Sequence, residues 1–139
     1  MPDGHAGGVN SLIAVLVRTV ATALTAAGAG WLMTVGEPED MVGANIGAGL
    51  MAFLAIAVVS LVWSFLDAKG GRSYLGAVAI WAVVGLLIGA LGALQAQGFD
   101  GPIDRAILWD DLKGLSILGG LLAVVPAVVG AGVGALARR

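Results

Sequence analysis

Arg18 is the one ionisable side chain that lies well inside an apolar stretch of this sequence. A charge at such a depth is costly in hydrocarbon, which makes this arginine a candidate functional residue. Its guanidinium can contact an anion or a lipid headgroup from a cavity. Alternatively, it can reach the headgroup region along its own aliphatic stem and act as an anchor. The sequence leaves both interpretations open.

Side chains suited to catalysis or metal binding are scarce. The only histidine is His5, cysteine is absent, and no cluster of His, Asp and Glu has the spacing of a metal site. The acidic segments 37–40 and 110–111 are charge runs, which are more typical of solvated loops than of cation sites. We therefore expect no enzymatic activity, no catalytic residue, no cofactor and no bound metal.

Two tryptophans and a proline join Arg18 as candidate substrate or lipid contacts. Trp63 lies near the end of an apolar stretch, and Trp81 lies about two turns inside another, where packing is favoured over ligand contact. Pro126 lies in the middle of the last stretch and cannot donate a hydrogen bond to the carbonyl of Leu122, which predicts a kink or a carbonyl with another partner. In transporters such a break often borders a cavity.

Small residues at four-residue spacing predict close contacts between membrane helices. The candidate helix-packing positions are Gly43, Gly47, Gly85, Gly89, Ala93, Gly130 and Gly134. Packing within one subunit is the simplest interpretation. A homodimer seam and the sliding surfaces of a transporter are the alternatives.

The elements that must position these residues are membrane helices. The chain is 59% hydrophobic and 12% charged, and its mean hydropathy is +0.99, far from the soluble average. Its apolar stretches approach or exceed the ~18 to 20 residues that a helix needs to cross a bilayer. Backbone polar groups must be paired internally there. The predicted fold class is all-α: a polytopic membrane protein with a four-transmembrane-helix bundle as its single domain, residues 1–139.

The predicted helices cover residues 10–35, 43–66, 74–96 and 115–137. The breaks between them are rich in glycine, proline and charge. The longest break, residues 97–114, contains Pro102, which suits the first turn of a short interfacial helix over residues 102–113 with Asp100 or Gly101 as its cap. An irregular loop is an equally open alternative for this segment.

The charge distribution predicts the orientation of the chain. Most of the basic residues fall on one side, namely Arg18, Lys69, Arg72, Arg138 and Arg139. Short basic loops stay on the cytoplasmic side, so both termini should be cytoplasmic in a multi-pass protein of the inner (cytoplasmic) membrane. The lipid bilayer is then the first partner, and a net charge of −2 argues against nucleic acid.

Two segments carry a resemblance to a known family. Residues 58–72 read VVSLVWSFLDAKGGR, and the last apolar stretch, residues 121–139, reads LLAVVPAVVGAGVGALARR. Together with the arginine of the first stretch, they resemble small four-helix actinobacterial membrane proteins assigned to the drug/metabolite transporter (DMT) superfamily. The resemblance implies transport of a small molecule by a dimer. The first stretch lacks the membrane-embedded glutamate of the related small multidrug exporters, so proton-coupled drug export is not expected.

The leading functional hypothesis is a transporter-like protein that moves a small molecule as a homodimer. Two copies would enclose a midplane cavity, whereas four helices alone are expected to enclose little space. One alternative is a non-transporting accessory or assembly subunit of a larger membrane complex. Another is a holin-like pore former. The sequence names no substrate and no coupling ion.

Overall fold

The computed structural model describes residues 4–36, 42–98 and 102–139. Side chains are described from residue 10 onward in the first helix and from residue 46 onward in the second. Its helices are α1 (Gly4–Thr34), α2 (Val42–Lys69), α3 (Tyr74–Ala96) and α4 (Arg105–Leu136). All four are long and apolar enough to cross a membrane. The prediction of an all-helical chain with four such helices is confirmed for the described residues.

Helix α4 is longer than predicted, because the segment before residue 115 continues directly into it. Neither a separate interfacial helix nor an irregular loop is present over residues 105–114. The helix is capped by Asp104, whose side chain accepts hydrogen bonds from the backbone N–H groups of Ala106 and Ile107 at 2.9 and 3.2 Å. No proline interrupts the chain between this cap and Pro126, and charged residues do not end a helix. The predicted cap at Asp100 or Gly101 falls outside the described residues.

Helix α2 also extends beyond its predicted end and places Asp67 in its last turn. The chain then reverses at Gly71, whose φ of 105° favours glycine. The N–H of Arg72 donates to the Asp67 carbonyl at 3.0 Å, which closes this end of the helix. Ser73 caps α3 by accepting a hydrogen bond from the N–H of Gly76 at 3.1 Å.

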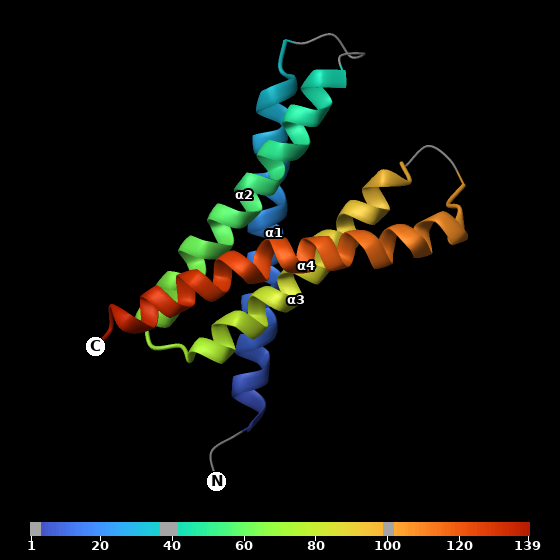
Figure 1. The fold of residues 1–139 in the computed structure, drawn as a ribbon. Coiled ribbons are helices and arrows are strands. Elements are labelled where there is room, and N and C mark those ends of the chain that lie inside the picture. The colour runs from blue at the N-terminus through green and yellow to red at the C-terminus, as the bar shows by residue number, and fades with distance from the viewer. Residues whose placement is uncertain (1–3, 37–41, 99–101) are drawn as a thin grey trace.

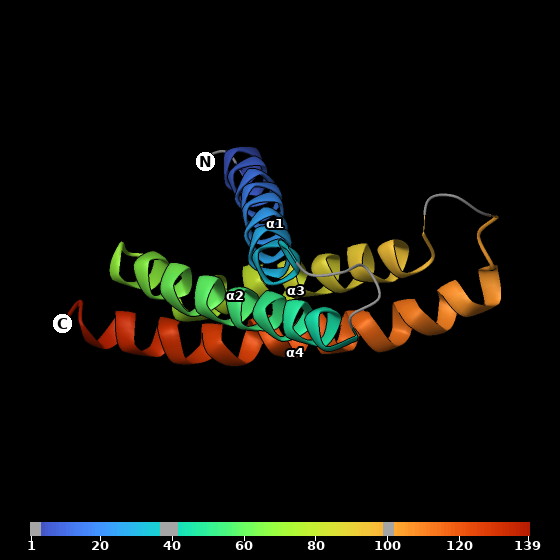
Figure 2. The same cartoon turned by 90° about the horizontal axis from the view of Figure 1, so that it is seen from above.

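Helix α4 connects the bundle, because it packs along both α2 and α3. Helix α1 packs mainly on α2 and less on α3, and within the described residues its backbone does not come close to that of α4. Figures 1 and 2 show α1 projecting away from the other three helices. The end of α1 lies beside the start of α2, the end of α3 lies beside the start of α4, and these two pairs diverge (Figure 1).

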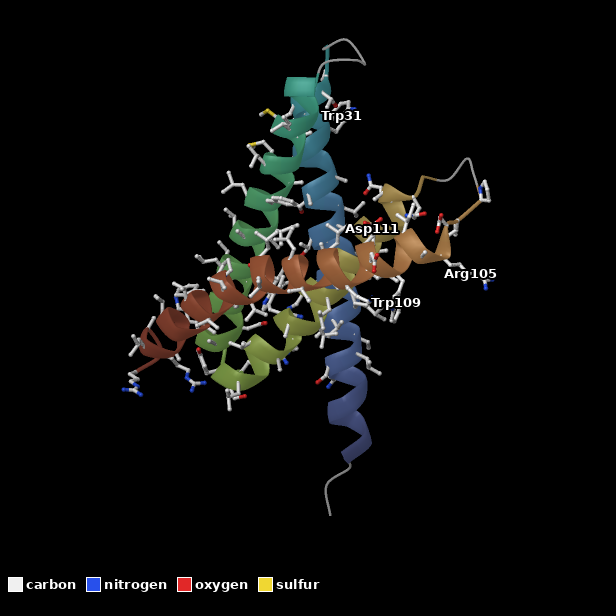
Figure 3. The ribbon with its side chains drawn as sticks, turned by 45° about the vertical axis from the view of Figure 1, so that its right-hand side comes forward. Trp31, Arg105, Trp109 and Asp111 are labelled. Atoms are coloured by element: carbon white, nitrogen blue, oxygen red, sulfur yellow. The ribbon has the colours of Figure 1, made fainter. Side chains whose placement is uncertain are left out.

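The two ends of the bundle differ in charge. We call one the basic end, because the last turn of α2, the turn before α3 and the end of α4 carry Lys69, Arg72, Arg138 and Arg139. The other is the acidic end, where the cap and first turns of α4 carry Asp104, Asp110 and Asp111 against Arg105 and Lys113. Figure 3 shows Trp31 near the end of α1 and Trp109 near the start of α4, so exposed tryptophans occupy the acidic end.

Glycines bring α3 and α4 into backbone contact. A Cβ atom at Gly85 would lie 2.6 Å from the Gly119 carbonyl oxygen, and one at Gly89 would overlap the Leu115 carbonyl. Ala93, one turn further along α3, is fully buried. Such close approach lets backbone and small side chains make dense van der Waals contact, which is the main source of helix association in lipid.

The second half of α4 packs on α2 in the same manner. A Cβ atom at Gly130 would overlap the Leu61 carbonyl, and one at Gly134 would overlap the Phe65 carbonyl. Gly47 has open space at its Cβ position, so it does not serve as a packing glycine in this chain. Gly43 lies outside the residues whose surroundings are described.

Substituting Gly130 tests this packing. We expect Gly130→Ala to lower the free energy of unfolding by about 1–3 kcal/mol, since its methyl group must displace the α2 backbone. Gly132→Ala, two residues along the same helix and with open space at its Cβ, should change stability little or raise it by up to about 1 kcal/mol. Helical circular dichroism during denaturation by sodium dodecyl sulfate measures both. Equal effects of the two substitutions would contradict the packing described here.

Candidate functional site

Arg18 is held by an ion pair with Asp67 across the α1–α2 contact. Its Nη2 lies 2.6 and 2.7 Å from the two carboxylate oxygens, and its Nη1 donates to the Ala14 carbonyl at 3.0 Å. Only 7% of the Arg18 side chain and 12% of the Asp67 side chain are exposed. The guanidinium is therefore buried within the protein, where it reaches the last turn of α2.

Aromatic rings cover the other side of the guanidinium. The Arg18 Cζ lies 5.0 Å from the centre of the Trp63 ring, which is a cation–π distance. Trp63 in turn packs edge-on against Trp81, with ring centres 6.3 Å apart. Trp81 is fully buried, in line with the favoured packing interpretation. Three of the four candidate contact residues thus form one continuous cluster, although they come from three helices.

Asp67 is the member of this site that the sequence reasoning missed. The predicted helix over residues 43–66 leaves Asp67 in the break before the third stretch, whereas α2 continues through it. Arg72 approaches the same carboxylate, with Nε 3.8 Å from Oδ2. The signal was present, because an arginine inside an apolar stretch requires a counter-charge and Asp67 is the one acidic residue between Asp40 and Asp100.

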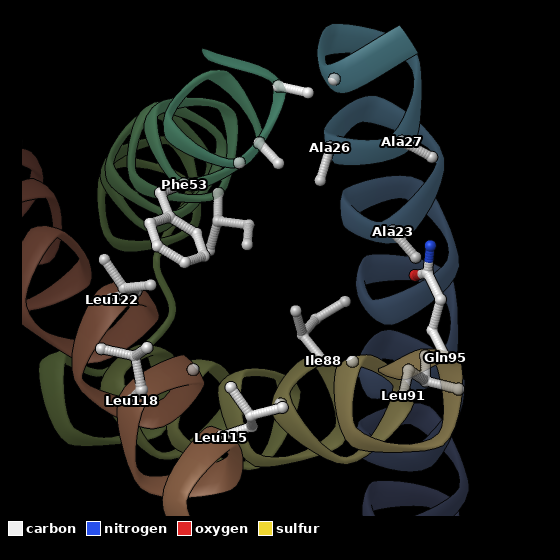
Figure 4. A pocket seen from close by; sticks show the side chains of 18 of the residues that line it. Ala23, Ala26, Ala27, Phe53, Ile88, Leu91, Gln95, Leu115, Leu118 and Leu122 are labelled. Carbon is white, nitrogen blue, oxygen red and sulfur yellow. The ribbon is translucent and has the colours of Figure 1, made fainter. Parts of the chain in front are cut away.

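A cavity of about 470 Å³ opens between the diverging helix pairs in the acidic half of the bundle. All four helices line it, as the close view in Figure 4 shows. Its wall is mainly apolar, with Phe53, Ile88 and Leu118 among the larger side chains, and Thr34 and Gln95 add polar groups toward the acidic end. The volume and the apolar wall are those of a small-molecule site.

None of the candidate contact residues Arg18, Trp63, Trp81 and Pro126 lines this cavity. Pro126 lies inside α4, one turn beyond Leu122, and Leu122 is part of the cavity wall. The carbonyl that loses its helical donor thus belongs to a cavity residue, as the proline pattern suggested. The side chains of Ile56, Ile88 and Leu122 also belong to the core around Trp81, so the aromatic cluster forms the floor beneath the cavity.

Several buried polar atoms near this floor have no hydrogen-bond partner. They are Arg18 Nε, Thr19 Oγ1, Thr22 Oγ1 and Trp81 Nε1. Thr25, in contrast, donates to the Ala21 carbonyl at 2.7 Å, the usual arrangement for a threonine in a membrane helix. The unpaired set consists of groups that donate hydrogen bonds, and such groups are costly to leave unpaired in a low dielectric.

Within the described residues, no group of three or more His, Asp or Glu side chains is placed to hold a metal ion. Comparison of the chain with known protein families, with characterised proteins and with solved structures gives no match. The ion pair, the aromatic cluster and the cavity are therefore the features that bear on function.

Removing one partner of the ion pair tests its role. We expect Asp67→Asn to lower the free energy of unfolding by about 3–5 kcal/mol, because it leaves the buried Arg18 charge uncompensated. The matched change Asp110→Asn breaks the exposed pair with Lys113 and should have little effect. Denaturation followed by circular dichroism in detergent distinguishes the two.

Replacing both partners gives a second comparison. The double variant Arg18→Met/Asp67→Leu leaves no unpaired charge, so it should recover most of the stability that Asp67→Asn loses. A double variant as unstable as the single one would show that packing at these positions, and not charge compensation, is what matters.

Proposed function

We propose that this chain is a transporter-like protein of the inner (cytoplasmic) membrane that binds a small apolar or amphipathic molecule in the cavity between its helix pairs. The observation that carries the proposal is the cavity itself. It is lined by all four helices and lies where the α1–α2 and α3–α4 pairs diverge. A site between two helix pairs can change its access when one pair tilts against the other, which is how many transporters operate.

The distribution of contacts supports a moving part. Helices α2, α3 and α4 are joined by backbone contacts at glycines, whereas the backbone of α1 does not come close to that of α4 within the described residues. Gly30 of α1 approaches α2 less closely, since a Cβ there would lie 3.3 Å from the Ala48 carbonyl oxygen. Apart from the Arg18–Asp67 pair, helix α1 is thus the least tightly packed element, and it contributes one wall of the cavity.

We keep the homodimer in the proposal, but its role differs from the one that the sequence suggests. The sequence suggested a dimer because four helices alone were expected to enclose little space, but a single chain forms the cavity. A second copy is therefore not needed to complete the site. Its role would instead be to cover the projecting first half of α1, where Leu12, Leu16 and Val20 are exposed.

The same projecting segment favours the accessory-subunit alternative, because a larger partner could occupy it equally well. Purification in a mild detergent separates the two readings. A stoichiometric second protein supports the subunit, and a self-dimer supports the transporter.

Filling the cavity tests the proposed function. Gly92 lines the cavity and has open space at its Cβ, so Gly92→Leu should occupy part of the volume without disturbing a helix contact. We expect it to reduce flux at least tenfold in proteoliposomes screened with radiolabelled apolar and amphipathic compounds. Gly28→Leu also meets open space but lies outside the cavity wall, so it should leave flux unchanged. Flux that both variants leave intact would contradict a transport route through this cavity.

The proposed topology has its own test. If the basic end faces the cytoplasm, fusions at both ends of the chain place a fluorescent reporter in the cytoplasm and leave alkaline phosphatase inactive. A phosphatase fusion between α3 and α4 should be active. Reporters at the two ends that fall on opposite sides would exclude four crossings.

A further inference from the structure

We propose that the cavity takes a single-chain amphiphile, with its anionic, hydrogen-bond-accepting head at the Arg18 cluster and its apolar chain in the cavity. This inference rests on the proposed function and names the substrate class of the same site. A long-chain carboxylate is the simplest molecule of this kind.

The head is assigned by the unpaired groups of the floor. The N–H groups of Arg18 Nε and Trp81 Nε1 can only donate, and the hydroxyls of Thr19 and Thr22 donate readily. All four side chains are more than nine-tenths buried. A set of buried donors is satisfied by a group that only accepts, and a carboxylate offers about four acceptor positions.

None of the four donors lines the cavity, but three of them lie on α1 between Arg18 and Thr22, one turn below its wall. Arg18, Thr22 and Ala26 follow at four-residue spacing, so they share one face of α1, and Ala26 is part of the cavity wall. Trp81 reaches the same region through Trp63, which lies against the Arg18 guanidinium. The polar floor and the apolar cavity are thus consecutive parts of one site.

The charge of the floor is suited to an anion. Asp67 accepts both of its short contacts from Arg18, and Arg72 adds a second positive group at 3.8 Å from that carboxylate. The three side chains carry two positive charges and one negative charge, which leaves one positive charge for a ligand. A cationic head would find the Asp67 carboxylate already paired with Arg18 and would be repelled by the remaining positive charge.

The dimensions suit one long apolar chain. Thr22 lies one turn below Ala26 of the cavity wall, and Thr34 lies at the polar rim; the helix rises about 18 Å between the two threonines. This is close to the ~15 Å of one leaflet, half of a bilayer's hydrocarbon core. An acyl chain of leaflet length therefore reaches from the donors to the acidic end.

Photolabelling of the full chain in lipid nanodiscs tests the assignment. The probe is hexadecanoic acid with a photoreactive diazirine at the end of its chain, and mass spectrometry locates the labelled peptides. Unlabelled hexadecanoate, hexadecanol and hexadecylamine compete, since they share a chain and differ only in the head. We expect hexadecanoate to compete at least tenfold better than the other two, because hydrogen bonds to a charged group are the strong ones.

A matched pair of variants tests the donors. Thr22→Val keeps the shape of the side chain and removes an unpaired hydroxyl, so it should lower the preference for hexadecanoate about tenfold. Thr25→Val removes a hydroxyl that is already bonded to its own helix and exposed, so the preference should not change. Equal effects of the two variants would overturn the assignment of the head.

The outcomes separate this inference from the proposed function. If Gly92→Leu abolishes the labelling and the three competitors act equally well, the cavity remains the binding site but the assignment of an anionic head is overturned. Stronger competition by hexadecylamine, or displacement by acetate alone, also overturns the substrate class. If Gly92→Leu and Gly28→Leu affect the labelling equally, the cavity is not the binding site, and the proposed function is overturned as well.

Discussion

The ion pair between Arg18 and Asp67 is the constraint on which the arrangement of the chain depends. A guanidinium inside an apolar stretch needs a partner at short distance, and the last turn of α2 supplies it with both carboxylate oxygens. This fixes the height of α1 against α2. The pair tolerates burial because the guanidinium also binds the Ala14 carbonyl and faces the Trp63 ring, so its charge is compensated on three sides.

The rest of the bundle is held by close approach of backbones. Helix α4 presents small residues to α3 in its first half and to α2 in its second, at Gly119 and Gly130 respectively. These contacts tie α2 and α3 to one central helix, so α2, α3 and α4 converge toward the basic end, while the α1–α2 and α3–α4 pairs diverge toward the acidic end. The cavity is the consequence of that divergence. It lies above the aromatic cluster because Trp81 fills the space where the helices come together.

Polar and apolar groups are thus separated along the length of the bundle. The basic half contains the ion pair, the paired tryptophans and the unpaired donors, and the acidic half contains an apolar space with a polar rim. A molecule with an anionic head and an apolar chain matches that division from end to end. Helix α1 carries both parts on one face and is the least tightly packed of the four, so binding and movement can be coupled through it.

The sequence by itself determined the class of the fold, because apolar stretches of membrane length leave the backbone no alternative to helices. It also identified Arg18 as unusual and named Gly85, Gly89, Gly130 and Gly134, which the structure places at helix contacts. It did not yield the partner of Arg18, since helix ends are decided by capping hydrogen bonds and Asp67 appeared to lie in a break. Gly47 fits the same spacing and packs against nothing within 4 Å, since spacing does not say which face of a helix meets another. Only the tertiary structure decided where the helices diverge, and therefore where a cavity exists.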